Sequence, residues 1–137
     1  MKKVYPVILT QTQDVVLVEV PDLEILTEGM SLADAIEMAR DAIGVTGISM
    51  EDHGESIPEP TNINDVDVMN GTFVGDGHSV VSLVDIDFAE YRKKSDNKMV
   101  RRNVTLPNWL NLEAEKAKIN VSKVLQEALM QKLGIYR

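Results

Sequence analysis

The sequence predicts an α+β protein of two parts, first strands with one helix, then one strand with two helices. Two observations support this prediction. Hydrophobic residues change along the chain from alternation to helical spacing, and the charge separates at Ser95. Residues 1–95 hold 6 basic and 18 acidic residues, a net charge of −12, whereas residues 96–137 hold 8 basic and 4 acidic residues, a net charge of +4. We therefore expect an acidic module joined to a basic one.

The composition is typical of a globular protein. The 137 residues are 44% apolar and 26% charged, a balance found in packed domains rather than in disordered segments. The absence of cysteine excludes disulfides, thiolate metal sites and cysteine nucleophiles. The N-terminus lacks the apolar stretch of a signal peptide, and no apolar run is long enough to span a membrane. We therefore expect a cytoplasmic protein with no membrane partner.

Three short strands are predicted before the first helix. Residues 3–10 and 15–20 are rich in Val and Ile and are separated by a short polar turn, which is typical of a β-hairpin. The Pro-Asp pair at 21–22 ends the second strand, and residues 24–28 supply a third.

The first helix is predicted to begin after Ser31. Ser31 and Asp34 match a capping pattern in which each side chain satisfies free backbone amides. Apolar residues follow at helical spacing as far as Ile43. Gly44 and Gly47 then predict the end of the helix.

A polar segment follows this helix, and Pro58 and Pro60 prevent regular structure in it. Residues 65–69 are a weak strand candidate. Residues 79–88 alternate between apolar and other side chains, which predicts a longer strand with one solvent-exposed face at its far end. Residues 89–98 are strongly charged, and we expect them to form a linker.

A strand is predicted at the start of the basic part. Side chains alternate across a strand, so within residues 99–106 the side chains of Arg101, Asn103 and Thr105 share one face. Arg102 falls on the opposite, apolar face, where its stem can extend outward near an edge.

Two helices are predicted to follow this strand. Pro107 suits the first turn of a helix that reaches about Lys118, and Asn120 resembles the N-cap of a second helix that ends at Gly134. The second helix carries an apolar stripe of Val121, Val124, Leu125, Ala128, Leu129 and Leu133. One strand and two helices in about 40 residues are too small to fold alone. We therefore expect a symmetric dimer in which the two strands pair antiparallel.

Such a dimer exposes a two-stranded ribbon that fits the major groove of DNA. Arg pairs with guanine, Asn pairs with adenine and the Thr methyl contacts thymine, so Arg101, Asn103 and Thr105 are the candidate base-reading residues. Asn120 and Ser122 lie where the second helix offers free amides and its positive dipole end to a phosphate. The alternative is a helical hairpin used only for dimerisation, with its basic residues solvated.

A family resemblance covers nearly the whole chain. Residues 100–134, which include VTLPNWL, EAEKAKINVS and VLQEAL, resemble the ribbon-helix-helix domains of HicB-type antitoxins of type II toxin–antitoxin systems. The opening hairpin fits the same family, as do VPDL at 20–23, TEG at 27–29, ADAIEMA at 33–39 and GESIPEP at 54–60.

The resemblance implies a two-part antitoxin that is not an enzyme. Residues 1–88 would form a shortened RNase H-like domain that covers a small, basic HicA-type toxin, which cleaves messenger RNA. Residues 89–98 would be a linker. Residues 99–137 would form a ribbon-helix-helix homodimer that binds the operator of its own operon, with a tetramer left open. An acidic inhibitor suits such a toxin, because a surface that binds RNA must be basic. Many relatives carry Pro-Gly where this chain has Glu24 and Ile25, which predicts a different bend there.

A nuclease is the first alternative. RNase H-like nucleases use clustered carboxylates to hold two metal ions, and the candidates here are Asp14, Glu19, Asp85 and Asp87. We favour a solvated strand face for these residues, because acidic residues are abundant throughout this part of the chain.

A ribbon-helix-helix transcriptional regulator whose N-terminal domain senses a small ligand is the second alternative. The two histidines, His53 and His78, lie in glycine-containing loops, whereas a transition-metal sensor needs several His or Cys ligands. The glycines at 71, 75 and 77 precede no predicted helix, so they do not form a phosphate-binding loop. We therefore expect no catalytic residue, no metal and no cofactor.

Overall fold

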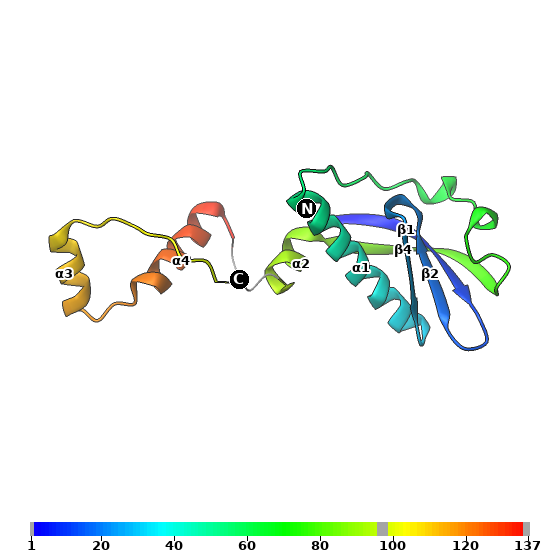
Figure 1. Ribbon diagram of the computed structural model, residues 1–137, viewed down its shortest axis with the longest axis horizontal. Coiled ribbons are helices and arrows are strands. Elements are labelled where there is room, and N and C mark those ends of the chain that lie inside the picture. The colour runs from blue at the N-terminus through cyan, green and yellow to red at the C-terminus, as the bar shows by residue number, and fades with distance from the viewer. Residues whose placement is uncertain (1, 96–98, 136–137) are drawn as a thin grey trace. The chain divides into compact units, whose positions relative to one another are not determined.

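The computed structural model describes residues 2–95 and 99–135 (Figure 1). The chain divides into two compact units, Met1–Lys98, here called the N-terminal unit, and Met99–Arg137, the C-terminal unit. The N-terminal unit combines a sheet with helices and the C-terminal unit contains two helices, so the predicted α+β class is confirmed. No helix of the described segments has the length and the apolar composition needed to cross a membrane.

The N-terminal unit is built on a four-stranded antiparallel sheet with the order β3-β2-β1-β4. Its strands are β1 (Lys2–Gln11), β2 (Val16–Val20), β3 (Ile25–Gly29) and β4 (His78–Asp87). Each one lies within one residue of its predicted bounds. Strands β3 and β4 form the two edges of this sheet.

Helix α1 (Leu32–Asp52) covers one face of the sheet (Figure 1). Alternate side chains of β1 and β2 point toward it, among them Tyr5, Val7 and Val18, and are fully buried. The helix contributes Ala39 to this core together with other small side chains. Small residues on the buried face of α1 let the helix lie close to the strands.

The predicted start of α1 is confirmed by its cap. The Ser31 hydroxyl accepts a hydrogen bond from the Asp34 amide at 3.1 Å. The Asp34 carboxylate in turn accepts one from the amide of Met30 at 2.8 Å, so both side chains satisfy amides at the helix start.

The predicted end of α1 is wrong, because the helix continues past both glycines to Asp52. A Cβ added at Gly44 would lie 2.7 Å from Cγ of Tyr91, and one at Gly47 would lie 2.2 Å from Cε1 of Phe88. The two glycines therefore serve close packing against aromatic rings rather than ending the helix.

Those two rings belong to helix α2 (Phe88–Ser95), which occupies most of the segment predicted as a linker. The Tyr91 hydroxyl donates to the Asp41 carboxylate at 2.6 Å, and Arg92 pairs with Asp52 at 3.0 Å. The charges that suggested a linker thus lie on a helix that is held to α1. Positions 96–98 of the predicted linker lie outside the described residues.

The segment between α1 and β4 crosses the sheet face opposite α1, since it lines a hollow with Pro6 and Ile8. The weak strand predicted at 65–69 is wrong, because two 3₁₀ turns, η2 (Ile63–Asp65) and η3 (Val68–Asn70), occur there instead. The Asp67 carboxylate accepts from the Met69 amide at 3.0 Å and so favours a turn over a strand.

The C-terminal unit contains helices α3 (Asn108–Lys116) and α4 (Val121–Leu133). Asn120 caps α4, since its side chain accepts from the Lys123 amide at 3.1 Å. Gly134 ends α4 with a φ of 72°. Both predicted boundaries of the second helix are confirmed.

Residues 99–107 form neither helix nor strand in the single chain, which differs from the strand predicted over 99–106. A strand exists through hydrogen bonds to a neighbour. The described part of the C-terminal unit offers no second strand with which this segment can pair.

The two helices of the C-terminal unit leave their apolar side chains exposed. No described residue of this unit is buried, and the large Trp109 side chain is 67% exposed. The predicted stripe of α4 is also uncovered, with Leu129 52% exposed and Leu133 71% exposed. Helices with an uncovered apolar stripe are stable only when that stripe is buried by another element.

We expect Leu129→Lys to weaken self-association of the full-length chain by at least about a hundredfold. Burying one leucine contributes about 1.5–3 kcal/mol, and a symmetric dimer loses two such side chains. Light scattering coupled to gel filtration at micromolar concentration measures the effect. Gln126→Lys, which adds the same charge to the same helix outside the stripe, is the control and should remain dimeric. A folded, monomeric wild-type chain would contradict the dimer.

Candidate functional site

The five residues predicted to contact DNA all lie in the C-terminal unit and are all exposed. Arg101, Asn103 and Thr105 belong to the extended segment before α3. Asn120 and Ser122 lie together at the first turn of α4, as predicted from the sequence. The structure therefore leaves every one of these side chains accessible to a partner.

An apolar groove of about 380 Å³ connects the extended segment to α4. It is lined by Val104, Thr105 and Leu106 and by Val121, Val124, Leu125 and Ala128. Of the three candidate base-reading residues, Thr105 alone borders this groove. Residues 104–106 and the first half of α4 therefore form opposite walls of one groove.

The first turn of α4 is suited to an anion. The Asn120 side-chain oxygen is used in the cap, which leaves its amide group to donate elsewhere. The amides of Val121 and Ser122 have no carbonyl within the helix to bond, because helices leave their first amides unpaired. These donors and the positive end of the helix dipole favour a phosphate at this turn.

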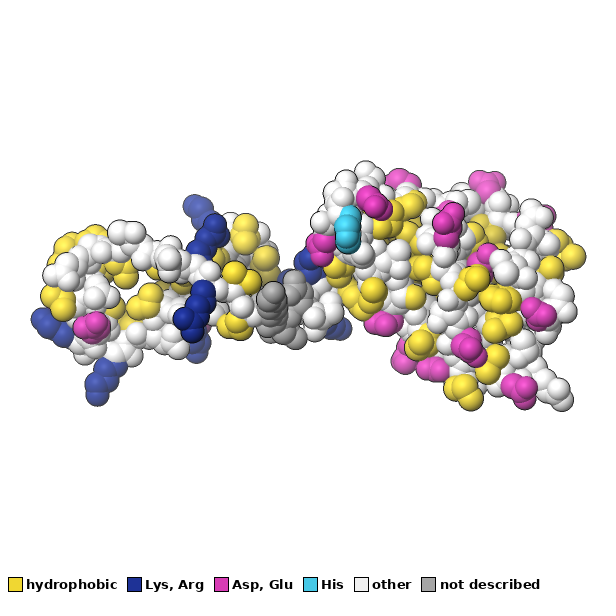
Figure 2. Space-filling view, viewed as in Figure 1, with side chains coloured by type: hydrophobic (Ala, Val, Ile, Leu, Met, Phe, Trp, Pro, Cys, Tyr) yellow, Lys and Arg dark blue, Asp and Glu magenta, His cyan; other side chains and the backbone are white. Residues whose placement is uncertain are grey.

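The charge asymmetry of the sequence is visible on the surface (Figure 2). Lys and Arg side chains project from the C-terminal unit, whereas Asp and Glu side chains are spread among apolar ones over the N-terminal unit. The two units therefore differ in the sign of their surface charge.

The Asp85 and Asp87 carboxylates, two of the four considered for a nuclease site, make contacts within the fold, whereas Asp14 is exposed in the turn after β1. Asp85 pairs with Arg40 at 3.0 Å and with Lys2 at 3.4 Å. Asp87 accepts from the amide of Glu90 at 3.2 Å, near the start of α2. Within residues 2–95 and 99–135, no three His, Asp or Glu side chains are grouped so that they could hold a metal ion.

These contacts shift the pKa values of both carboxyl groups. The hydrogen bond from Arg40 is the largest cause of the lowered pKa of Asp85, and Lys2 adds to it. The backbone amide of Glu90 is the largest cause of the lowered pKa of Asp87. The lowered pKa values favour the ionised form of both carboxyl groups, which accept hydrogen bonds from donors of the folded chain.

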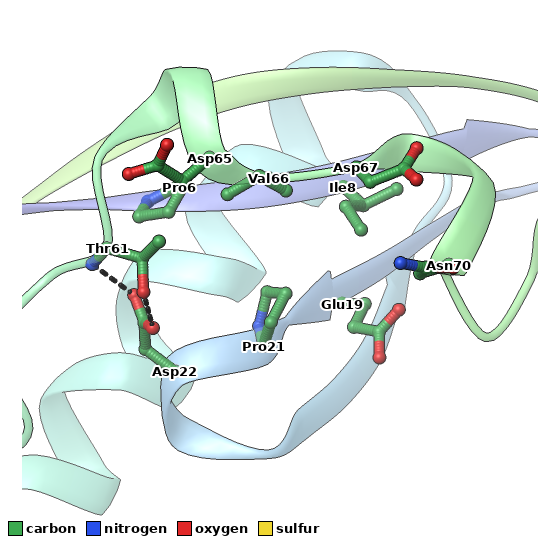
Figure 3. A pocket seen from close by; sticks show the side chains of 10 residues that line it. All are labelled: Pro6, Ile8, Glu19, Pro21, Asp22, Thr61, Asp65, Val66, Asp67 and Asn70. Carbon is green, nitrogen blue, oxygen red and sulfur yellow. Dashed lines mark hydrogen bonds between the residues drawn. The ribbon is translucent and has the colours of Figure 1, made fainter.

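A second hollow, of about 230 Å³, lies between strands β1 and β2 and the segment that crosses them (Figure 3). The Asp22 carboxylate on its wall accepts from the Thr61 amide at 2.9 Å. Glu19 accepts from the Thr72 amide and hydroxyl, both at 2.8 Å. The Glu19 and Asp22 carboxylates therefore hold the crossing segment in place, which is a structural reason for their position in the hollow.

The chain thus joins an acidic sheet-and-helix unit to a basic two-helix unit. The chain belongs to the HicB-like antitoxin family, because the profile described as "HicB_like antitoxin of bacterial toxin-antitoxin system" matches residues 5–129. Comparison with curated protein sequences gives no match.

Solved structures of low sequence identity share the fold. One is a chain of a toxin–antitoxin complex from Streptococcus pneumoniae, 22% identical, with a TM-score of 0.60 over 96% of this chain and 99% of that one. Another is the Burkholderia pseudomallei antitoxin HicB, also 22% identical, with a TM-score of 0.52 over 98% of this chain and 99% of that one.

We expect Arg40→Gln to raise the pKa of the Asp85 carboxyl while leaving that of Asp87 lowered. Removing the guanidinium removes the largest cause of the Asp85 shift, whereas Asp87 depends on a backbone amide. A lowered folded-state pKa stabilises the fold above the unfolded pKa of about 3.9, and this contribution disappears as the pH falls through the folded pKa. Carboxyl NMR titration measures both groups in one experiment. An unchanged Asp85 pKa in the variant would show that Arg40 does not hold this carboxylate.

Proposed function

We propose that this protein is an antitoxin that binds and neutralises a HicA-type, mRNA-cleaving toxin and represses its own operon by binding operator DNA. The observation that carries the proposal is the division of the chain into an acidic unit with its own core and a basic unit whose apolar side chains are unburied. Membership of the HicB-like antitoxin family supports the toxin as the partner of the chain.

Neutralisation is the work of the N-terminal unit in this proposal. We infer that it adopts the shortened RNase H-like form of the family and acts by covering the toxin rather than by catalysis. A toxin that cleaves RNA needs cations to hold phosphates. The net charge of −12 over residues 1–95 attracts such a surface and steers rapid association.

Operator binding is the work of the C-terminal unit, which we propose to be a ribbon-helix-helix dimer. Residues 99–106 of two copies pair as an antiparallel ribbon, which supplies the strand partner that one chain lacks. The exposed stripe of α4 is buried between the copies together with Val104 and Leu106, which line the groove on the inner face of the ribbon. Two-stranded ribbons of this kind enter the major groove.

We assign two kinds of DNA contact to the five exposed residues. Arg101, Asn103 and Thr105 read base edges from the outer face of the ribbon. Asn120 and Ser122 hold a phosphate at the first turn of α4 and fix the dimer on the duplex.

The toxin half of the proposal is tested with a purified HicA-type toxin. We expect the full-length chain to suppress RNA cleavage by that protein at about equal molar amounts. Added salt should slow the association, because steering is screened over about 10 Å at 0.1 M ionic strength. Arg101→Ala should inhibit as well as the wild type does, since the two units have separate tasks. Undiminished RNA cleavage in the presence of the wild-type chain would refute the neutralising role.

The DNA half is tested by comparing Arg101→Ala with Arg102→Ala on cognate operator and on scrambled DNA. We expect Arg101→Ala to cost about 1–3 kcal/mol on the operator and to relax discrimination at one position of each half-site. Arg102→Ala should change base preference less, because alternation turns its side chain away from the groove. Ser122→Ala should weaken all sequences evenly, since phosphate contacts carry no direct sequence information. Selective loss of recognition in Arg102→Ala alone would show that the opposite face meets DNA.

A further inference from the structure

We propose that the N-terminal unit docks the basic toxin on one particular edge of its sheet, formed by β3 and the first turn of α1. This surface, here called the β3 edge, consists of Leu26, Met30 and Leu32 with the acidic side chains around them, Glu24, Glu28 and Asp34. The inference rests on the proposed function and specifies which surface of the N-terminal unit contacts the toxin.

Three large apolar side chains are exposed within seven residues at this edge. Leu26 is 56% exposed, Met30 is 77% exposed and Leu32 is 54% exposed, although their neighbours Ile25 and Gly29 are buried. Among the described strands, β3 pairs with β2 on one side and has no partner on the other. An open strand edge with large exposed apolar side chains on it and next to it is typical of a surface that another protein covers.

The charged residues near the β3 edge in sequence have one sign. Between Lys3 and Arg40 the sequence contains no Lys or Arg and seven acidic residues, namely Asp14, Glu19, Asp22, Glu24, Glu28, Asp34 and Glu37. An apolar centre with an acidic rim fits a partner whose own apolar residues are ringed by Lys and Arg. A surface that binds RNA has such a basic ring, so its capture here would block access of RNA.

The opposite edge of the sheet is unsuited to a basic partner. Strand β4 also exposes Val80 and Leu83, but Arg40 lies against it and donates to the Asp85 carbonyl at 3.0 Å and to the Asp85 carboxylate at the same distance. Lys2 approaches the same carboxylate at 3.4 Å. Cations thus cover part of β4, whereas β3 has none nearby in sequence.

The β3 edge is also held in place before any partner binds. A Cβ added at Gly29 would lie 2.3 Å from the Ala35 amide nitrogen, so the end of β3 lies directly against the backbone of α1. The Asp34 carboxylate fixes the Met30 amide, and the Ser31 cap fixes the helix start. Little ordering is therefore needed on binding, which favours affinity.

The test measures binding of the full-length chain to a purified HicA-type toxin, by calorimetry or surface plasmon resonance. We expect Leu26→Lys to weaken binding by about tenfold or more, because it removes an apolar contact and places a cation against a basic partner. Leu83→Lys is the matched control, since it adds the same cation to the other sheet edge at a leucine of similar exposure. Its affinity should stay within about twofold of the wild type.

Hydrogen exchange of the wild-type complex gives a second readout that does not depend on how a variant folds. We expect the amides of β3 and of residues 30–32 to gain protection on binding, and those of β4 to remain unchanged. Equal affinity of Leu26→Lys and the wild type, or protection on β4 rather than β3, would overturn the β3 edge while leaving the antitoxin role intact. Failure of the wild-type chain to bind would overturn the proposed function and this inference together.

Discussion

The N-terminal unit depends on the close approach that small residues allow along α1. Ala35 and Ala39 let the helix lie flat on the sheet, and Gly44 and Gly47 admit the rings of Tyr91 and Phe88. That packing fixes both sheet edges as well. At one end the helix start lies against Gly29 and sets the end of β3. Farther along, Arg40 reaches β4. A bulkier α1 would move the surfaces on which the unit acts, in addition to loosening its core.

Local patterns predicted the elements whose causes are local. Composition and turn signals located β1, β2 and β3, and alternation located β4. The Ser31 and Asn120 caps located the starts of α1 and α4, because each signal lies within a few residues of its effect. The end of α1 was missed because its cause lies far away in sequence. Gly47 meets Phe88 across 41 positions, and without that ring a glycine in a helix reads as a stop.

The candidate sites show the same difference between local causes and causes that lie outside the local sequence. Residue type and alternation were enough to nominate Arg101, Asn103 and Thr105, but the strand that would orient them depends on a neighbour that one chain does not contain. The β3 edge was missed although a signal existed. The spacing of Leu32 matches that of the buried Ala35, Ala39 and Ile43, but the structure exposes Leu32 at N1, before the helix has turned its apolar face to the sheet. Periodicity alone does not show which members of a stripe lie beyond the end of the core.

The two open edges of this small sheet raise the problem of aggregation, since an unpaired strand can add to its copy in another molecule. The protein meets this problem differently at its two edges. On β4 the Arg40 guanidinium occupies a main-chain carbonyl that an incoming strand would need. On β3 the main chain stays open, but two copies brought together there would oppose Glu24 and Glu28 with the same acids of the other copy. The acidic rim that we propose to attract a cationic partner would therefore also oppose edge-to-edge pairing of two copies.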